Sequence, residues 1–142
     1  MKITICGSTI FARDMYEANK SLINRGHEVF LPEFVVEFVN GKLGYELGTL
    51  SREEGAKKKK KYDLIRKHYN KIKESDAILV INNKKNETEN YIGANTLIEI
   101  AFAYILDKKI YLLNDLPEFD YLLEEVKAME PIILNGDLRK IE

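Results

Sequence analysis

Cysteine and histidine are scarce in this sequence. Cys6 is the single cysteine, and His27 and His68 are the only two histidines. One cysteine excludes an internal disulfide and fits a reducing compartment. No two of these three residues lie close together along the chain, so the sequence does not indicate a zinc site. We therefore expect a protein that uses neither a metal nor an organic cofactor.

Long apolar runs and an excess of one charge are also missing. The longest apolar stretches fall short of the roughly 20 residues that a membrane-spanning helix needs. The N-terminus has the pattern of a strand and lacks the long apolar run of a signal peptide. The 22 basic and 23 acidic residues give a net charge of -1, which provides no general attraction to nucleic acid. These features predict a cytoplasmic protein with neither membrane nor nucleic-acid polymer as a partner.

The composition is that of a folded globular protein. Of 142 residues, 45% are hydrophobic and 32% are charged, which differs from the composition of disordered chains. This length suits one domain that spans residues 1–142 and has a core of its own.

Strand and helix patterns alternate along the chain. Short apolar or β-branched runs predict strands at residues 2–6, 27–31, 77–81, 109–113 and 131–134. Helical spacing of apolar residues predicts helices over residues 10–25, 56–74 and 121–129, and residues 90–106 predict a turn followed by a helix. This order predicts an α/β fold, a Rossmann- or flavodoxin-like three-layer sandwich around a five-stranded parallel sheet.

Residues 33–55 interrupt this alternation. Their pattern is irregular and includes Gly41, Gly44 and Gly48, which predicts a long connection. A loop of such length in a compact domain usually has a function. We interpret the lysine run at 57–61 that follows as a solvated segment, with phosphate binding as the alternative.

Polar residues follow three of the predicted strands. Parallel sheets bind ligands at the carboxyl ends of their strands, which here are followed by residues 7–9, 82–95 and 114–115. Ser8 and Thr9 either bind phosphate, together with free backbone N–H groups, or cap the next helix. Asn90 and Asn95 either contact a sugar or base or shape a turn.

Glu99 is the only charged residue between Glu89 and Asp107, in a segment that is otherwise almost wholly apolar. A buried carboxylate is costly unless it is paired, hydrogen-bonded or used. The nearby helix N-terminus would keep it ionised, which makes it a candidate nucleophile. The alternative is a capping box in which Glu99 reaches back to Thr96. Its place after the third predicted strand favours catalysis.

Three motifs stand in order along the chain. They are Cys6-Gly-Ser-Thr9, Ser75-Asp-Ala-Ile-Leu-Val80, and Gly93-Ala-Asn-Thr-Leu-Ile-Glu99 with Lys108-Lys-Ile-Tyr-Leu-Leu113. Together they resemble the nucleoside 2-deoxyribosyltransferase-like superfamily, which includes deoxyribonucleoside-monophosphate N-glycosidases. The resemblance implies cleavage or transfer of the N-glycosidic bond of (deoxy)nucleosides or their 5′-monophosphates, with Glu99 as nucleophile.

The same resemblance implies where the substrate and a second subunit bind. Substrate contacts are expected at Gly7, Ser8, Thr9, Asn90, Gly93 and Asn95. The resemblance also implies a homodimer or larger assembly, because a neighbouring subunit often completes the active sites of this family. The apolar residues 34–38 either serve that interface or cover the site as a lid.

This sequence departs from the family pattern at the second catalytic group. The family's aspartate before the third strand is here His68, and Asp63, one turn and a little further back on the same predicted helix, is a substitute. Either side chain is a candidate general acid for the departing base. A looser likeness to cytokinin-activating phosphoribohydrolases, and a non-catalytic nucleotide-binding module, are the alternative functions.

Overall fold

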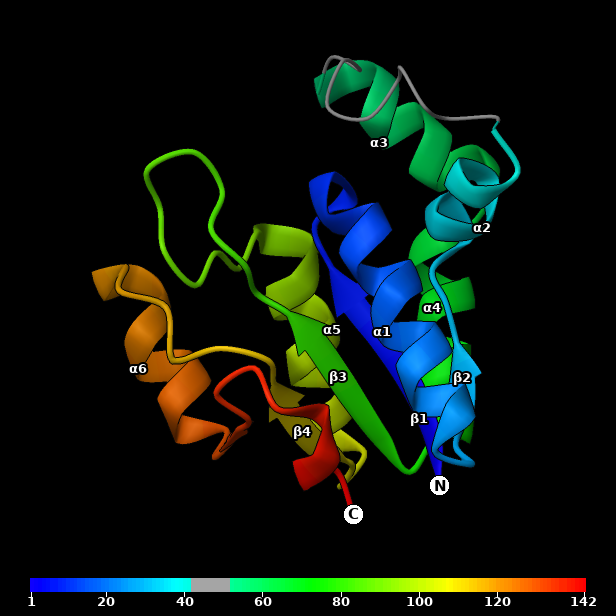
Figure 1. Ribbon diagram of the computed structural model, residues 1–142. Coiled ribbons are helices and arrows are strands. Elements are labelled where there is room, and N and C mark those ends of the chain that lie inside the picture. The colour runs from blue at the N-terminus through cyan, green and yellow to red at the C-terminus, as the bar shows by residue number, and fades with distance from the viewer. Residues whose placement is uncertain (42–51) are drawn as a thin grey trace.

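The protein folds around one five-stranded parallel sheet. This computed structural model describes residues 1–41 and 52–142 (Figure 1), so Gly44 and Gly48 lie outside the described residues. The strands are β1 (Lys2–Gly7), β2 (Glu28–Phe30), β3 (Ala77–Ile81), β4 (Lys109–Leu112) and β5 (Ile132–Ile133). They lie in the order β2-β1-β3-β4-β5, and every neighbouring pair is parallel. The predicted fold class is confirmed, and this strand order is that of flavodoxin-like sheets.

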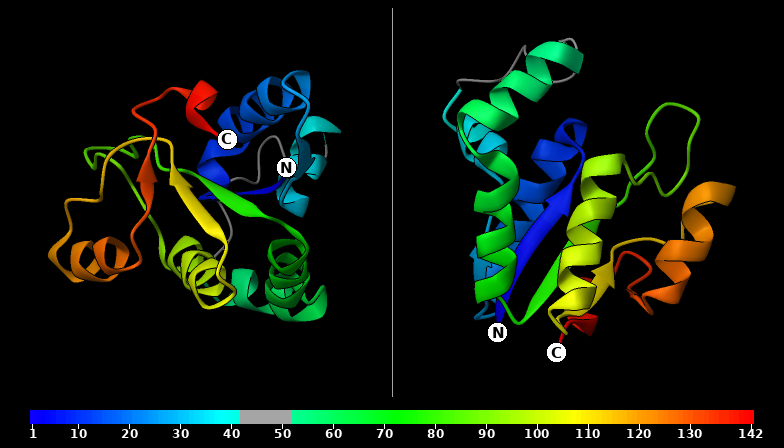
Figure 2. Two further views of the ribbon diagram at one scale, coloured as in Figure 1. Left: turned by 90° about the horizontal axis from the view of Figure 1, so that it is seen from below. Right: turned by 180° about the vertical axis from the view of Figure 1, so that it is seen from behind.

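Helices cover both faces of the sheet. One face carries α1 (Ala12–Asn24), α2 (Glu33–Val39) and the C-terminal 3₁₀ turn, while the other carries α4 (Leu64–Glu74), α5 (Ala94–Ile105) and α6 (Asp120–Ala128). The left view of Figure 2 shows these two layers with the sheet between them. Side chains alternate along β1, so Ile3 and Ile5 join the first core while Cys6 joins the second. The three-layer arrangement buries apolar surface on both faces of each central strand.

The region after Pro32 differs from its prediction. Residues 33–39 form α2 rather than irregular chain, and Val35 is fully buried against the core that contains α1. Pro32 occupies the N-cap position and Glu33 lies in the first turn, both of which favour a helix start. Three valines in seven residues lower helix propensity, which explains why the sequence pattern was ambiguous.

The basic segment forms two helices rather than one. Helix α3 (Arg52–Lys61) has no buried residue, so the predicted solvated character of the lysine run is confirmed. Tyr62 and Asp63 follow the end of this helix at Lys61. Asp63 has a left-handed backbone with φ of 50°. Figure 1 shows α3 projecting beyond the sheet from the end of α4. The prediction that Asp63 and His68 share one helix is therefore wrong, because the chain turns between α3 and α4.

None of the helices in residues 1–41 and 52–142 combines the length and apolar character needed to cross a lipid bilayer.

Candidate functional site

The carboxyl ends of β1 and β3 form the centre of the candidate site. Chain connections leave β1 and β3 toward opposite sides, which is the switch point where ligands bind in such sheets. Gly7 ends β1 and lies beside Ile81, the last residue of β3. A Cβ atom on Gly7 would lie 2.6 Å from Cε of Met15 and 3.0 Å from the carbonyl oxygen of Ile81. Any larger residue at position 7 would therefore press against Met15 and the backbone of β3 at the point where the chain leaves β1.

A cleft of about 690 Å³ opens at this switch point. Its walls come from α2, α3, α4, the start of α5 and the turn after β1. Most predicted site residues line it: Gly7, Ser8, Thr9, His68, Gly93, Asn95 and Glu99. The structure thus brings together residues that are separated by more than 90 positions in the sequence.

Asp63 and Asn90 lie apart from this group. Both carboxylate oxygens of Asp63 accept hydrogen bonds from Nη1 of Arg66 at 3.1 Å, and its side chain is exposed beside a separate surface groove. Asn90 has a left-handed backbone with φ of 53°, and its Nδ2 donates to the carbonyl oxygen of Leu116 at 3.2 Å. Asn90 thus shapes a turn and joins two loops. Asp63 contacts Arg66, and the predicted partner that lies beside Glu99 is His68.

Neither predicted capping role is present. Helix α5 has Gly93 as its N-cap, so Thr96 and Glu99 both lie inside the helix and cannot form a capping box. Ser8 precedes a 3₁₀ turn at Thr9–Phe11 without a hydrogen bond from its side chain to that turn, and the N-cap position of α1 is Phe11. The hydroxyls of Ser8 and Thr9 are therefore not used as helix caps.

Glu99 extends from α5 toward the end of β1. Its Oε1 atom accepts a hydrogen bond from Nδ2 of Asn95 at 2.9 Å. Its Oε2 atom is buried and has no hydrogen-bond partner among the described residues. A buried polar atom without a partner is uncommon and often marks a functional group.

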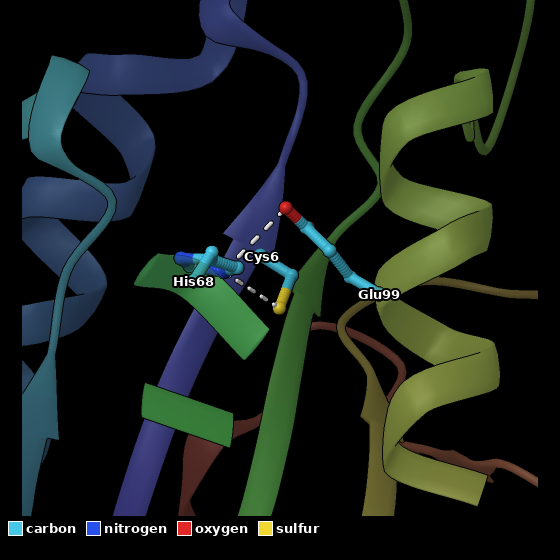
Figure 3. A group of neighbouring side chains, drawn as sticks. All are labelled: Cys6, His68 and Glu99. Atoms are coloured by element: carbon cyan, nitrogen blue, oxygen red, sulfur yellow. Dashed lines mark hydrogen bonds and ion pairs between the residues drawn. The ribbon is translucent and has the colours of Figure 1, made fainter. Parts of the chain in front are cut away.

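Cys6, His68 and Glu99 meet at this point from three different elements. The Nε2 atom of His68 lies 3.4 Å from Sγ of Cys6 and 3.6 Å from Oε1 of Glu99. Figure 3 shows the three side chains pointing toward one another from α4, β1 and α5. All three residues are buried.

Burial holds all three groups in their neutral forms. It raises the pKa of Glu99 to about 8, although hydrogen bonds from Cys6 and Asn95 and the charge of Lys59 act in the opposite direction. Burial, assisted by the charge of Lys71, lowers the pKa of His68 to about 4. The 3.6 Å contact therefore joins a neutral imidazole to a carboxylic acid at neutral pH. The expectation that the helix N-terminus keeps Glu99 ionised is wrong, because Glu99 is the sixth residue of α5, beyond the first turn, and burial raises its pKa.

Cys6 has the electrostatics of an unreactive thiol. Burial raises its pKa well above the ordinary value, and the neighbouring carboxyl group of Glu99 raises it further. The sequence analysis missed this residue because no histidine lies near it along the chain. Its position could have indicated the site. Cys6 lies one residue before the end of β1, and the alternation of side chains along the strand directs it toward the layer of α4 and α5.

The cleft carries an excess of positive charge. Two of its acidic residues are matched, because Glu37 lies 3.7 Å from Nζ of Lys58 and Glu33 lies 3.6 Å from Nζ of Lys67. The described basic residues that line the cleft are Arg52, Lys58, Lys59, Lys67, Lys71 and Lys85, against Glu33, Glu37 and Glu99 as the acidic ones. A cleft in which basic residues outnumber acidic ones attracts anions.

Two polar loops at the same end of the sheet hold each other in place. The backbone N–H of Asn114 donates to Oδ1 of Asn82 at 2.8 Å, and Nδ2 of Asn82 donates to the carbonyl oxygen of Asp115 at 2.8 Å. Asn82 is fully buried. The segments at 82–95 and 114–115 thus meet as predicted, and these particular side chains serve structure.

Comparisons with solved structures find several similar proteins, among them two enzymes. A CMP N-glycosidase of Clostridium botulinum is 20% identical, with a TM-score of 0.48 over 95% of this chain and 90% of its own. A 2-deoxyribosyltransferase of Bacillus psychrosaccharolyticus is 19% identical, with a TM-score of 0.47 over 79% of this chain and 71% of its own. No protein-family model and no curated protein matches the sequence.

Proposed function

We propose that this protein cleaves or transfers the N-glycosidic bond of a (deoxy)nucleoside 5′-monophosphate, with Glu99 as the nucleophile. The observation that carries the proposal is the buried Oε2 atom of Glu99, which has no hydrogen-bond partner in the described chain and belongs to a residue lining the cleft at the switch point. The motif resemblance seen in the sequence supports the same chemistry.

The reaction needs a carboxylate on one face of the sugar. Breaking a glycosidic bond develops positive charge at C1′, and a carboxylate stabilises that charge or traps C1′ covalently. In the proposed step a C1′–O bond forms to Glu99 while the C1′–N bond breaks and its electron pair leaves with the base. Water or a second base then attacks C1′ and releases Glu99, which gives hydrolysis or transfer respectively.

His68 is the group placed to handle the proton of Glu99. Glu99 is protonated at neutral pH in the free protein and must lose that proton before it attacks. Nε2 of His68 lies 3.6 Å from Oε1 of Glu99 and is unprotonated at that pH. The developing charge at C1′ favours the carboxylate, so the proton passes to His68 and becomes available to the departing base.

The charge of the cleft supports a phosphorylated substrate. Lys58 and Lys59 of α3 line the cleft together with Lys71 of α4, and the basic residues outnumber the acidic ones. A 5′-phosphate would be bound by such a wall, whereas an uncharged nucleoside gains little from it. The phosphate-binding alternative for the lysine run is therefore part of the proposal.

The test is the release of free base from a panel of nucleosides and 5′-monophosphates, followed by chromatography. The Glu99→Gln variant keeps the size of the side chain and removes the nucleophile, so it should lower release about a hundredfold or more. Glu124→Gln, on the exposed side of α6, is the matched control and should keep the wild-type rate. Release by Glu99→Gln at the wild-type rate would contradict the nucleophile. Binding of a monophosphate without any release would indicate the non-catalytic module.

A further inference from the structure

The three side chains at the base of the cleft have an arrangement that catalysis by Glu99 alone does not require. Sγ of Cys6, Nε2 of His68 and a carboxylate oxygen of Glu99 all lie within 4.8 Å of one another. The side chains of His68 and Glu99 are only 8% and 9% exposed, and Cys6 is fully buried. A soft thiol, an imidazole and a carboxyl group thus share one small buried volume (Figure 3).

Cys6 and Nε2 of His68 share a hydrogen bond of 3.4 Å, but hydrogen bonding among the three groups is incomplete. The 3.6 Å separation between His68 and Glu99 is too long for a hydrogen bond. Oε2 of Glu99 lacks a partner among the residues described. Natural proteins rarely leave a buried carboxyl oxygen unsatisfied, so this atom points to a ligand.

The separations fit the ligand positions around one tetrahedral ion. Zinc binds sulfur at about 2.3 Å and nitrogen or oxygen at about 2.0–2.1 Å, so tetrahedral geometry separates the ligand atoms by about 3.3–3.6 Å. The observed distances are 3.4 Å from Sγ to Nε2 and 3.6 Å from Nε2 to Oε1. The remaining pair, Sγ of Cys6 and a carboxylate oxygen of Glu99, lies within 4.8 Å, so the side chains of Cys6 and Glu99 can reach one ion by moving toward each other.

The chemistry of the three groups selects the class of ion. Binding of the ion displaces the protons of Cys6 and Glu99 to solvent, and the resulting thiolate and carboxylate carry two negative charges, which one divalent cation balances. Thiolate and imidazole ligands favour zinc and similar transition metals over Mg²⁺ and Ca²⁺, which prefer oxygen ligands.

We propose that Cys6, His68 and Glu99 form a binding site for one divalent transition-metal ion of the zinc type, with a fourth position open toward the cleft. The ligands come from β1, α4 and α5, so the site exists only in the folded chain. No sequence motif indicates this site, because 62 positions separate Cys6 from His68. An ion in this site occupies Glu99 and blocks its attack on a sugar, so zinc acts as an inhibitor of the proposed reaction.

Cobalt(II) is the probe that tests the site most directly. The chelator-treated full chain is titrated with Co²⁺, and the near-ultraviolet absorption of a thiolate-to-cobalt charge transfer is followed. Because Cys6 is the single cysteine, such a band reports Cys6 and no other residue. We expect the band to saturate at one equivalent, together with the visible absorption of tetrahedral cobalt, and to disappear when Zn²⁺ is added. Absence of the band from the wild-type protein would overturn the proposal.

Variants separate this site from other metal-binding groups. Cys6→Ser should abolish the charge-transfer band, and His68→Gln should weaken Co²⁺ binding tenfold or more. His27→Gln is the control, because His27 lies 3.3 Å from the N-terminal amine, which makes this pair a competing site for transition metals. An unchanged cobalt affinity in Cys6→Ser and His68→Gln, with loss in His27→Gln, would assign the metal to the N-terminus and contradict the proposal.

The metal site and the proposed reaction can fail independently. Metal binding is measured by absorption on protein without substrate, so it needs no activity. If the protein releases base at the same rate with and without stoichiometric Zn²⁺ and shows no cobalt band, the metal site is contradicted and the proposed function stands. If the cobalt band appears but no base is released from any substrate, the proposed function is contradicted and the metal site stands.

Discussion

Nε2 of His68 lies 3.6 Å from Oε1 of Glu99, inside a part of the protein where both side chains are more than nine-tenths buried. Burial moves the two pKa values in opposite directions, to about 4 for His68 and to about 8 for Glu99. The pair is therefore neutral at pH 7, and its proton lies on the acid rather than on the base. A nucleophilic role for Glu99 then makes activity depend on removing that proton.

The first prediction is the pH profile of base release. If Glu99 passes its proton to His68 and on to the departing base, kcat/KM should be level between the pKa of His68, about 4, and that of Glu99, about 8, and should fall about tenfold per pH unit above pH 8 as this proton is lost. The measurement is kcat/KM between pH 6 and 9, in buffer that contains a chelator. A rise of kcat/KM toward pH 8 would show that Glu99 loses its proton to solvent before it attacks and would contradict the transfer to His68, and a flat profile through pH 9 would contradict the raised pKa of Glu99.

The second prediction concerns stability in the same pH range. The folded protein holds the Glu99 proton between about pH 4.5 and about pH 8 while the unfolded chain loses it, so stability falls as the pH rises. His68 acts oppositely, because its stabilising contribution is complete above pH 6.5 and is lost as the pH falls toward about 4. The fall due to Glu99 is therefore seen without opposition between pH 6.5 and about 8.

Urea unfolding at pH 6.5 and pH 8 measures this effect. Over this window wild type should lose at most about 2 kcal/mol of unfolding free energy relative to Glu99→Gln, since one pH unit corresponds to about 1.4 kcal/mol. The Gln variant removes the titration while keeping the shape of the side chain, so other groups cancel in the difference. A constant difference between the two proteins at both pH values would contradict the raised pKa of Glu99.

The sheet was predictable because each strand is a short apolar run separated from the next by a helical pattern. The residues 77–81 are buried without exception, and such a strand allows only a central place in a parallel sheet. Helix α2 was not predictable, because its valines suit a strand as well as a helix and its burial depends on contacts with distant segments.

The site was predictable in its location and less so in its chemistry. The rule that parallel sheets bind ligands at the carboxyl ends of their strands predicted that the turn at residues 7–9 and Glu99 share one site, and both line the same cleft. The spacing between Asp63 and His68 could not show which of them faces Glu99, because the backbone turns at Asp63 with φ of 50°. Cys6 was missed because its partners lie far away in sequence. The neutral state of Glu99 was missed because desolvation depends on packing that a sequence does not display.

The third prediction tests the close packing at the end of β1. Gly7→Ala should destabilise the protein by about 1–3 kcal/mol, since its new Cβ atom meets Cε of Met15 and the rigid backbone oxygen of Ile81. Gly55→Ala is the matched control within exposed α3, where a Cβ atom meets nothing within 4 Å. Alanine there should stabilise by about 1 kcal/mol through helix propensity. Equal effects of the two substitutions on urea unfolding would contradict the steric account.

The fourth prediction distinguishes His68 from Asp63 as the partner of Glu99. His68→Gln should lower kcat for base release about a hundredfold, because it removes the proton acceptor beside Glu99. It should also change the pH profile, because without this acceptor Glu99 must lose its proton to solvent, so kcat/KM should rise toward pH 8, which a purely structural change would not cause. Asp63→Asn should leave kcat near wild type, because Asp63 contacts Arg66 and is exposed. Larger losses in Asp63→Asn than in His68→Gln would return the catalytic role to Asp63.

The fifth prediction concerns the phosphate of the substrate. Lys59 lines the cleft, and its charge favours the ionised form of Glu99, whereas Lys57 of the same run does not line the cleft and pairs with Glu53 at 3.2 Å. Lys59→Gln should raise KM for a nucleoside 5′-monophosphate several-fold and leave KM for the corresponding nucleoside almost unchanged, because only the first substrate carries the charge that Lys59 attracts. Lys57→Gln changes the net charge by the same amount and should alter neither KM. The effect of Lys59→Gln should also shrink as salt is added, because screening weakens an exposed charge first. If both variants raise both KM values equally, the lysine run acts through the general field of the protein and Lys59 does not bind phosphate.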